Sequence, residues 1–271
     1  MKAIFFEQHG GLEVLKYADV PEPKPSPGWA LIKVKAVALN HLDIWVRRGW
    51  QGLQLDMPHI GGSDICGEIV SVNGSSDYKA GTRVIVNPGF VPTSDEYTRR
   101  GEDSLSPNYK IIGEQLKGGF AEYVIVPATN VFIAPERLSD EEAAAPILVG
   151  TTIWRMLYKR AKLRAGESIL VVGSGGGVNS LTISMAAASG ATVYALAGSK
   201  EKEKKAFDLG AKYVLNYNEA RNWHVEILKL TKGHGVDVVV DNVGVETFQK
   251  SLRAVARGGR IVTVGNTTGY D

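Results

Sequence analysis

The sequence predicts an α/β protein in which a β-rich domain precedes a doubly wound parallel sheet. In the first half of the chain, short β-like segments alternate with loops, and their irregular spacing favours a partly barrel-like β domain. In the second half, Val- and Ile-rich runs alternate with helical segments, which is typical of a buried parallel sheet with helices on both faces. A glycine-rich turn follows the first of these runs. We therefore expect a first domain at residues 1–130 and a second at residues 131–271.

The composition excludes several classes of protein. Of the 271 residues, 44% are apolar and 22% are charged, which is close to the globular average. The formal net charge of +2 is too small to indicate a nucleic-acid or membrane partner. No segment reaches the roughly 18 uninterrupted apolar residues of a membrane helix, and the N-terminus has no apolar stretch of signal-peptide length. The single cysteine, Cys66, excludes internal disulfides and is typical of a cytoplasmic protein.

The β-like segments of the first half are bounded by runs rich in Pro, Gly and Ser. The expected strands cover residues 2–6, 30–39, 65–72, 82–86 and 121–126. Residues 40–49 have a helical pattern. A loop without helical or strand period occupies residues 87–114, and loops of this length are uncommon in compact domains unless they are functional or disordered.

A helical pattern at residues 139–161 begins the second half. Ser139 is the expected N-cap, and Glu142 follows at the spacing of a capping box. Strands and helices then alternate. The expected strands cover residues 168–174, 192–198, 213–217, 236–244 and 260–266, and the helices between them cover residues 179–190, 201–210, 224–233 and 246–259.

The turn after the first parallel strand has the properties of a dinucleotide pyrophosphate site. Such a site needs a tight turn, close backbone approach and free N–H groups at a helix N-terminus. A strand precedes the turn, a helix follows it, and a second strand comes within about 30 residues, as the motif requires. The residues expected there are Gly173, Ser174, Gly175, Gly176, Gly177 and Val178. The G-x-G-x-x-G pattern is incomplete, because its third glycine falls on Ser180 or Asn179.

The end of the second parallel strand bears on the choice between NAD and NADP. NAD sites usually place an Asp or Glu there for the ribose 2′-hydroxyl. This strand ends in Ala197, Gly198 and Ser199, and Lys200 and Lys202 follow. The missing acid and the nearby cations favour a 2′-phosphate. We therefore expect NADP(H) rather than NAD(H), although a solvated helix start would carry the same charges.

Segments spread over the whole chain resemble one family. They include "KAIFFEQHGGLEVLKYADVPEPKPSPGWALIKVKAVALNHLDIWVRRG", "PHIGGSDICGEIVSVNG", "GGFAEYVIVP", "EEAAAPILVGTTIWRML" and "GGRIVTVG". Together with the glycine turn, they resemble the medium-chain dehydrogenase/reductase superfamily, which contains zinc alcohol dehydrogenases and zinc-free quinone oxidoreductases. The resemblance implies a GroES-like substrate domain, a Rossmann domain and an active site in the cleft between them. It also implies a homodimer or homotetramer. Members usually continue beyond the strand at residues 260–266, so we expect this sequence to lack the usual C-terminal part.

The resemblance allows the catalytic zinc positions to be tested one at a time. The first ligand position, a Cys in the zinc enzymes, is Asn40 here, the second, a His, is Ser63, and the third aligns with Leu148. Amide, hydroxyl and alkyl groups are poor zinc ligands. Asp64 matches the Glu beside the family's His, but one carboxylate cannot form the site. We therefore expect no catalytic zinc.

Other residues near these positions are weaker candidates for metal binding. His41 and Asp43 flank Asn40, where capping or solvation explains them, and His59 is expected in a loop. A metal site needs three or four ligands with defined geometry. The alcohol proton relay of the family is also expected to be absent, because its Ser/Thr and His positions fall on Leu42 and Trp45.

Without zinc, hydride can be delivered only to an acceptor that is already electrophilic, such as a quinone or an α,β-unsaturated carbonyl. The segment "ALNHLDIWVRRG" resembles the quinone-oxidoreductase pattern, and Asn40 is expected to donate a hydrogen bond to the substrate oxygen or to the nicotinamide amide. Trp45 and Trp50 are expected either to form an apolar wall for a flat substrate or to pack in the core or between the domains. Ser63 and Asp64 complete the expected substrate site. Further cofactor contacts are expected at Thr152, Tyr217, Asn242, Val243, Gly265 and Asn266, most of them at the carboxyl ends of strands.

The sequence thus predicts a zinc-independent, NADP(H)-preferring oxidoreductase that reduces quinones or activated alkenes. Two alternatives remain open. One is an alcohol dehydrogenase-like enzyme acting on alcohols or aldehydes. The other is an NADPH-binding redox-sensing or crystallin-like protein with little turnover. No residue has the pattern of a general acid, so the proton is expected to come from solvent.

The resemblance also explains the loop at residues 87–114. In zinc-bearing relatives a lobe at this place holds a structural zinc with four Cys, and these positions fall on Pro92, Asp95, Thr98 and Ser106. None of them carries a thiolate, so we expect no metal in the lobe. We expect the lobe to be held by charge pairs among Asp95, Arg99, Arg100, Glu102 and Asp103.

Overall fold

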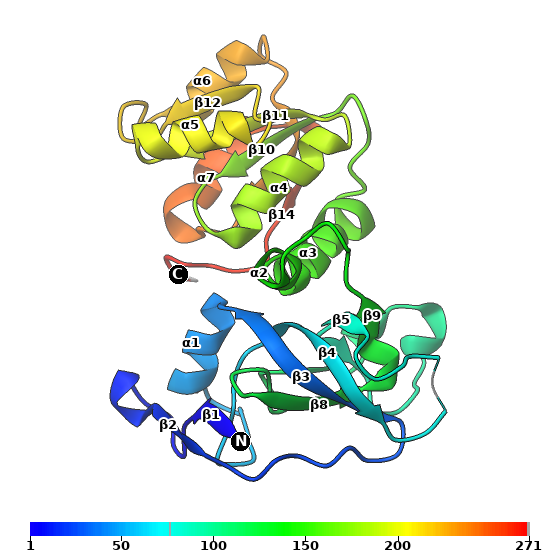
Figure 1. Cartoon of the computed structure of the whole chain (residues 1–271). Coiled ribbons are helices and arrows are strands. Elements are labelled where there is room, and N and C mark those ends of the chain that lie inside the picture. Colours follow the sequence, from blue (N-terminus) through cyan, green and yellow to red (C-terminus); the bar gives the residue numbers. More distant parts are fainter. Residues whose placement is uncertain (76, 270–271) are drawn as a thin grey trace. The chain divides into compact units, whose positions relative to one another are not determined.

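The computed structural model describes residues 1–75 and 77–269. The chain forms two compact units, Met1–Leu148 and Val149–Asp271. The first unit contains antiparallel sheets and the second contains a parallel sheet, so the predicted α/β class is confirmed (Figure 1). Strand β9 (Val131–Ile133) pairs with strand β5 (Arg83–Val86) of the first unit. The first unit therefore extends beyond the expected limit at residue 130.

Antiparallel pairing builds the main sheet of the first unit. Its order is β8-β3-β4-β5-β9, and the strands not yet given are β3 (Trp29–Ala38), β4 (Asp64–Val72) and β8 (Tyr123–Pro127). Alternate side chains are buried in the core, among them Ile32 and Ile65, because successive side chains of a strand point to opposite faces. Strand β1 (Lys2–Phe5) pairs separately with β2 (Lys16–Asp19). These strands confirm the β-rich pattern predicted for this half.

Two helices of the first unit have clear local causes. Helix α1 (His41–Arg48) follows β3 where the sequence predicts it. Helix α2 (Asp140–Ala144) begins with the predicted capping box. Ser139 Oγ accepts a hydrogen bond from the N–H of Glu142 at 3.2 Å, and the carboxylate of Glu142 accepts one from the N–H of Ser139 at 2.9 Å. The cap satisfies N–H groups that the first turn of a helix leaves unpaired.

The helix expected at residues 139–161 is divided into three elements. After α2 come α3 (Ile147–Trp154) and the π-helical segment η5 (Arg155–Arg160). Pro146 separates α2 from α3, because proline lacks the backbone N–H and disfavours the helical conformation in the residue before it. The prediction of one continuous helix was therefore wrong.

Residues 87–114 form a lobe with short elements of its own: β6 (Gly89–Phe90) pairs with β7 (Lys110–Ile111), and 3₁₀ turns lie at Thr98–Arg100 and Asp103–Leu105. Asp95 Oδ1 accepts the N–H groups of Tyr97 and Thr98, each at 2.9 Å. The Ser106 hydroxyl and the N–H of Thr98 lower the pKa of Asp95. Three positions matched to zinc-binding cysteines, Asp95, Thr98 and Ser106, therefore still lie together.

The lobe does not contain the expected charge pairs. Among its described residues, the ion pair joins Arg100 to Glu96 at 3.3 Å, and Glu96 is outside the set that the sequence indicated. Asp95 instead bonds to nearby backbone N–H groups, because a carboxylate in a tight turn can satisfy them directly. Hydrogen bonds around one carboxylate hold this part of the lobe.

The second unit is a five-stranded parallel sheet in the order β12-β11-β10-β13-β14. The strands are β10 (Ser168–Val172), β11 (Thr192–Ala197), β12 (Tyr213–Asn216), β13 (Val236–Asp241) and β14 (Val255–Val262). The strand order reverses between β10 and β13, and ligands bind open α/β sheets at such a switch point, outside the carboxyl ends of the strands. Strand β14 begins earlier than expected, because Val255 already pairs with Val236 before an irregularity in the ladder.

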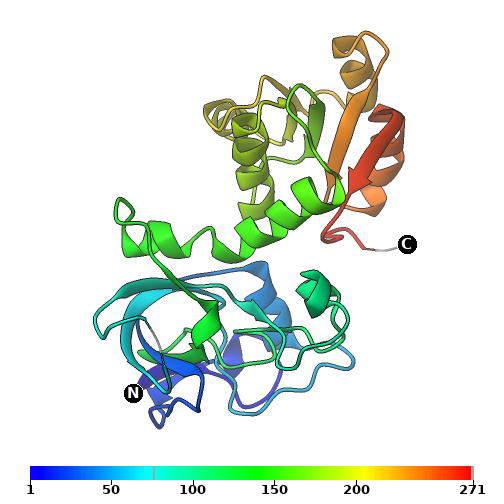
Figure 2. The same cartoon turned by 90° about the vertical axis from the view of Figure 1, so that its right-hand side faces the viewer.

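Helices cover both faces of this sheet (Figure 2). They are α4 (Gly177–Ala188), α5 (Lys200–Asp208), α6 (Trp223–Leu230) and α7 (Val245–Ala254). On one face, Ile169 and Val171 of β10 pack with residues of α4 and α5. On the other face, Leu170 packs with residues of α6 and α7. The run "SILVV" is apolar at nearly every position because both faces of the strand are buried.

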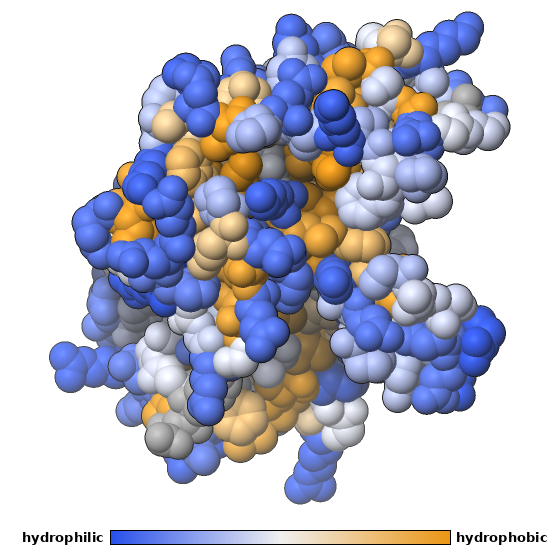
Figure 3. Space-filling model, turned by 90° about the horizontal axis from the view of Figure 1, so that it is seen from below, coloured by the Kyte–Doolittle hydropathy of each residue, from blue (hydrophilic) through white to orange (hydrophobic). Residues whose placement is uncertain are grey.

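The surface is mixed in polarity. Figure 3 shows hydrophobic groups gathered near the centre of one face, with hydrophilic groups around much of its margin. Several large apolar side chains are exposed, including Leu39 and Tyr17. Within residues 1–75 and 77–269, no helix has both the length and the hydropathy required to cross a membrane.

Candidate active site

The first candidate site is a cluster around the carboxylate of Asp64, the first residue of β4. Asn40 precedes α1 and donates a hydrogen bond from Nδ2 to Asp64 Oδ2 at 2.7 Å. The backbone N–H of Leu148 donates to Asp64 Oδ1 at 2.5 Å. Asp64 is only 1% exposed, so the two bonds compensate a carboxylate that has lost most of its water. The cluster joins residues that are 24 and 84 positions away from Asp64 in the chain.

This cluster occupies the positions that the sequence comparison matched to catalytic zinc ligands. Asn40 and Leu148 stand at the first and third positions, and Asp64 lies between them through its two oxygens. Leu148 has no side-chain donor atom, and the amide nitrogen of Asn40 faces a carboxylate. Among the described residues, no group of three or more His, Cys, Asp and Glu side chains could hold a metal ion. The residues present therefore do not fit a catalytic zinc.

A second carboxylate, Asp43, supports the same segment. Asp43 Oδ2 accepts the backbone N–H of Asn40 at 2.7 Å, and Oδ1 accepts the N–H of Gly62 at 3.2 Å. The first of these bonds is the N-terminal cap of α1. Asp43 thus ties the start of α1 to the loop before β4, and it is a structural residue that the sequence analysis treated only as a weak metal candidate.

Burial changes the proton affinity of both carboxylates. Burial raises the pKa of Asp64 to about 6, against the opposing hydrogen bonds from Asn40 and Leu148, and the charge of Asp43 raises it further. Burial also raises the pKa of Asp43, while its bonds to Asn40 and Gly62 act in the opposite direction. Loss of water disfavours the ionised form of any carboxyl. The cluster therefore contains a carboxyl that titrates close to neutral pH.

Ser63, Trp45 and Trp50 are not brought into this hydrogen-bonded cluster. Ser63 is completely buried, and among the described residues its hydroxyl has no hydrogen-bond partner. It lies beside Gly113, where an added Cβ would be 2.7 Å from the hydroxyl oxygen. The two tryptophans are 45% and 44% exposed, and Trp45 contacts the ring of His41 edge-on at 4.8 Å. Neither tryptophan is therefore buried in the core of the first unit.

His59 is a buried residue rather than a metal ligand or an exposed loop residue. It is 1% exposed, and its Nε2 lies 3.4 Å from the carbonyl oxygen of Gly113. Burial lowers the pKa of His59 to about 4, and the charge of Lys117 adds to the effect. The imidazole is therefore neutral at physiological pH.

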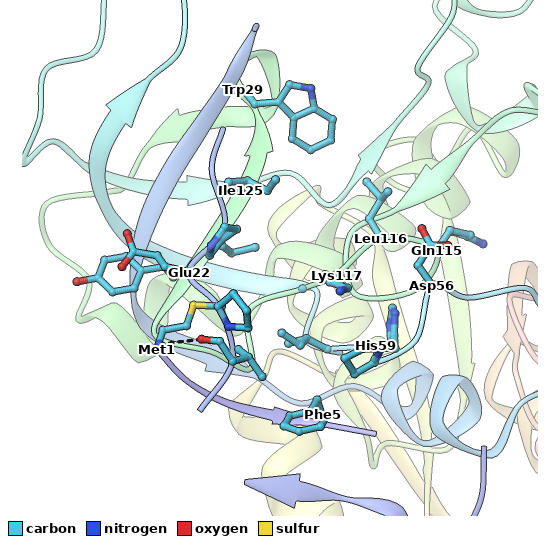
Figure 4. A pocket seen from close by; sticks show the side chains of 18 residues that line it. Met1, Phe5, Glu22, Trp29, Asp56, His59, Gln115, Leu116, Lys117 and Ile125 are labelled. Carbon is cyan, nitrogen blue, oxygen red and sulfur yellow. Dashed lines mark hydrogen bonds between the residues drawn. The ribbon is translucent and has the colours of Figure 1, made fainter. Parts of the chain in front are cut away.

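His59 also lines a cavity of about 430 Å³ in the first unit. Figure 4 shows Trp29 and Ile125 on one side of this cavity, Gln115 and Leu116 on another, and Phe5 on a third. Asn40 and Asp64 do not line it. The cavity is thus separate from the carboxylate cluster.

The second candidate site is the glycine turn between β10 and α4. Gly173 and Gly176 have φ values of +87° and +81°, a conformation that side-chain-bearing residues rarely adopt. An added Cβ at Gly176 would meet no atom within 4 Å, whereas one at Gly177 would lie 3.3 Å from Val149 Cγ1. The turn is thus open at Gly176, and Gly177 lets α4 approach α3. This backbone fits a dinucleotide pyrophosphate, because N–H groups at the start of α4 are accessible to an anion.

Asn179, one of the two residues on which the third motif glycine falls, has a structural role that the sequence did not reveal. Its Nδ2 donates to the carbonyl oxygen of Val172 at 3.0 Å, and its Oδ1 accepts from Asn242 Nδ2 at 2.9 Å. Asn242 Oδ1 in turn accepts the N–H of Val264 at 2.9 Å. This chain of amides joins the first turn of α4 to residues at the ends of β10, β13 and β14. Asn242 was expected to contact the cofactor, but both ends of its side-chain amide form hydrogen bonds with other residues of the protein.

The two lysines at the start of α5 have different environments. Lys200 pairs with Glu203 at 3.4 Å and with Glu219 at 3.3 Å. The side chain of Lys202 instead lies over the glycine turn, where a Cβ added at Gly175 would be 3.5 Å from its Nζ. Ser199 is the N-cap of α5 and accepts the N–H of Lys202 at 3.3 Å. Lys202 is thus the better placed of the two cations for an anionic ligand of the turn.

The remaining expected cofactor residues are distributed around the same edge of the sheet. Ser174 is buried, and Tyr217 follows β12 with its hydroxyl against Gly198. Val178 lies in α4 and packs against the core.

The carbonyl oxygen of Val243 accepts a hydrogen bond from the N–H of Thr268 at 2.9 Å. Gly265 and Asn266 follow β14. Thr152 lies within α3.

Asp241, at the end of β13, is a further buried residue of this edge. Its Oδ1 accepts from the N–H groups of Val243 and Gly244 and from the Thr247 hydroxyl, and its Oδ2 accepts from the Ser251 hydroxyl at 2.6 Å. The carboxylate caps the loop that leads into α7. Its position at the end of a buried strand was a signal available in the sequence.

Comparisons with known proteins agree with both units. Residues 26–136 match the family model of the alcohol dehydrogenase GroES-like domain, and residues 177–271 match that of the zinc-binding dehydrogenases. A quinone oxidoreductase of Mus musculus is 33% identical over 98% of this chain and 73% of its own length. The acryloyl-coenzyme A reductase of Metallosphaera sedula is 34% identical over 98% of this chain and 77% of its own length.

A solved structure of an NAD-dependent alcohol dehydrogenase is also similar, with a TM-score of 0.96 and 41% identity over 100% of this chain and 79% of that one. The chain belongs to the medium-chain dehydrogenase/reductase superfamily. The expectations of an NAD(P)H-dependent oxidoreductase with a GroES-like domain and a Rossmann sheet are thereby confirmed. The three relatives act on different substrates by their names, so family membership leaves the substrate class open.

Proposed function

We propose that this protein reduces a quinone or an α,β-unsaturated carbonyl with NADPH, without a catalytic zinc. The observation that carries the proposal is the Asp64 cluster, in which hydrogen bonds to one carboxylate join Asn40 and Leu148, the residues at the first and third positions that correspond to zinc ligands. Relatives named as a quinone oxidoreductase and an acryloyl-coenzyme A reductase support this substrate class. An electrophilic acceptor needs no Lewis acid, whereas an alcohol must lose a proton before it gives up hydride.

Reduction of such an acceptor adds one hydride and one proton. The nicotinamide, when bound, supplies the hydride. Asn40 has a second side-chain N–H besides the one given to Asp64, and this group is proposed to donate to the acceptor oxygen as negative charge develops there. The proton is proposed to come from solvent. The carboxylates of Asp43 and Asp64 hold Asn40 at both its backbone and its side chain.

The preference for NADPH is proposed to depend on Lys202. Its ammonium group lies near Gly175 of the turn, while Lys200 is engaged by two glutamates. The residue that follows β11 is Gly198, which carries no acidic side chain, and the Tyr217 hydroxyl lies against it. A cation without a neighbouring acid favours a ribose 2′-phosphate over a free 2′-hydroxyl.

The test is NADPH oxidation by the 271-residue chain with a panel of 1,4-benzoquinones, naphthoquinones and enones, before and after treatment with a chelator. We expect turnover that is unchanged by the chelator and by added zinc. A similarity of 41% to an NAD-dependent alcohol dehydrogenase makes alcohol oxidation the second candidate function. Chelator-sensitive oxidation of ethanol or butanol with NAD, in the absence of quinone reduction, would establish that candidate and overturn the proposal.

A further inference from the structure

Asp64 connects three segments of the first unit through one carboxylate. Oδ2 accepts from Asn40 Nδ2 at 2.7 Å, and Oδ1 accepts from the N–H of Leu148 at 2.5 Å. The N–H of Leu148 is a backbone group and can only donate a hydrogen bond. It donates to Oδ1 of Asp64, so Oδ2 is the oxygen that remains for Asn40. Asp64 is almost fully buried, so water does not compete strongly for either oxygen.

This arrangement determines the orientation of the Asn40 amide. An ionised carboxylate only accepts hydrogen bonds, so the NH₂ group of Asn40 must face Asp64 and its carbonyl oxygen must point elsewhere. The two ends of an amide are nearly equal in shape, but the Asn40 side chain also faces the N–H of Asp43 in the capping box of α1, so the cap and Asp64 favour the same orientation and Asp64 opposes the reversed one. The carboxylate therefore selects one of two orientations of a group that we place in the substrate site.

We propose that Asp64 is a positioning residue, which acts on the substrate only through the orientation of the Asn40 amide. The proposal rests on the function proposed above, in which Asn40 donates to the acceptor oxygen. In this role the carboxylate holds together positions where zinc-bearing relatives have metal ligands. Misplacement of a reacting partner by about 1 Å can cost on the order of 10²-fold in rate, so a residue without substrate contact can still have a large effect.

The informative substitution is Asp64→Asn, which keeps the shape of the side chain. Its Oδ1 can still accept from Leu148, but its NH₂ group then faces the NH₂ group of Asn40. Two donors cannot bond to each other, so the Asn40 amide must turn over or move away. We expect kcat to fall about 10²-fold, with an unchanged Kd for NADPH, because the glycine turn belongs to the other unit.

The experiment measures kcat in four proteins: the unchanged chain, Asp64→Asn, Asn40→Ala and the double variant. If Asp64 acts through Asn40, the Asp64→Asn change lowers kcat about 10²-fold when Asn40 is present and by less than about threefold in the Asn40→Ala background. An equal effect in both backgrounds overturns the proposal, and so does a normal kcat in Asp64→Asn. Asp140→Asn is the matched control, since that carboxylate pairs with Arg83, and its kcat should be unchanged.

Thermal unfolding of the same four proteins separates this inference from the proposed function. It needs neither substrate nor cofactor. If the Asn40–Asp64 contact exists as described, the decrease in Tm of the double variant is smaller than the sum of the two single decreases. Additive decreases in Tm overturn the contact even if quinones are reduced. Coupled decreases in Tm without any quinone or enone turnover would leave the contact in place and remove the proposed function.

Discussion

The glycine turn of the second unit and the Asp64 cluster of the first unit are built in opposite ways. The turn consists of one continuous segment, and its expected binding groups are backbone N–H groups beside an open position, Gly176. The cluster consists of side-chain and backbone groups from three separate segments, and Asp64 at its centre is almost fully buried. A backbone site can thus be recognised from local sequence, whereas a side-chain site depends on which segments the fold brings together.

The largest expected effect tests the turn. Gly176→Asp places a negative charge in the open space where a pyrophosphate would bind, at a position with φ of +81°. We expect the Kd for NADPH to increase at least about 100-fold, because anion binding at a helix N-terminus depends on the N–H groups and the local charge. Fluorescence titration with NADPH measures this effect.

Gly166→Asp is a closely matched control for that change. Gly166 has φ of +86°, an added Cβ there meets no atom within 4 Å, and it lies in the same unit. The Gly166→Asp variant should have a backbone strain similar to that of Gly176→Asp, but its Kd for NADPH should be unchanged. Equal weakening by both substitutions would show that strain, and not the site, is responsible.

The second-largest expected effect is a pH dependence of stability that comes from Asp64 in the cluster. The folded-state pKa of Asp64 is raised by burial to about 6 from its ordinary value of 3.8, so between these values the folded state binds more protons than the unfolded state. Stability from this group therefore falls as pH rises through that window, by at most about 3 kcal/mol. We expect the free energy of unfolding, measured in urea, to decrease relative to that of Asp64→Asn between pH 4 and about 6.

Asp140 is a carboxyl whose pKa is shifted in the opposite direction from that of Asp64, and the same urea unfolding measurement tests it. Its pKa is lowered, first by the hydrogen bond with Arg83, so its contribution to stability is lost as pH falls. Removal of Asp140 should therefore change the pH dependence in the opposite direction from removal of Asp64. If Asp64→Asn and the unchanged chain have parallel stability profiles, Asp64 is not the titrating carboxyl.

The smallest expected effect tests whether Lys202 causes a preference for NADPH over NADH. Lys202→Ala should raise the Kd for NADPH about tenfold and leave that for NADH nearly unchanged, because a charge-assisted contact with the 2′-phosphate is lost. Lys200→Ala serves as the control, since Lys200 is engaged by Glu203 and Glu219. A greater loss in Lys200→Ala, or equal losses for the two cofactors, would contradict the assignment to Lys202.

The lobe at residues 87–114 resembles the Asp64 cluster, because in both a carboxylate accepts hydrogen bonds where zinc-bearing relatives have metal ligands. Asp95, Thr98 and Ser106 were each matched to a thiolate position, and the sequence indicated that none of them carries a thiolate. It did not indicate that these residues remain neighbours, or that Asp95 would accept N–H groups of Tyr97 and Thr98. The expected charge pairs were wrong because exposed ion pairs contribute little, whereas a carboxylate beside unpaired N–H groups gains directly from bonding to them.

The sequence alone determined the fold class, the five parallel strands, the glycine turn and the superfamily, because these depend on local period, composition and motifs. It also predicted that Asn40, Ser63 and Leu148 are not zinc ligands, since that prediction depends only on side-chain chemistry. Only the tertiary structure decided the partner of Asn40, the burial of Ser63, the Asn179–Asn242 amide chain and the different environments of Lys200 and Lys202. Each of these depends on contacts between segments distant in sequence, and one residue's chemistry does not specify which distant segment packs against it.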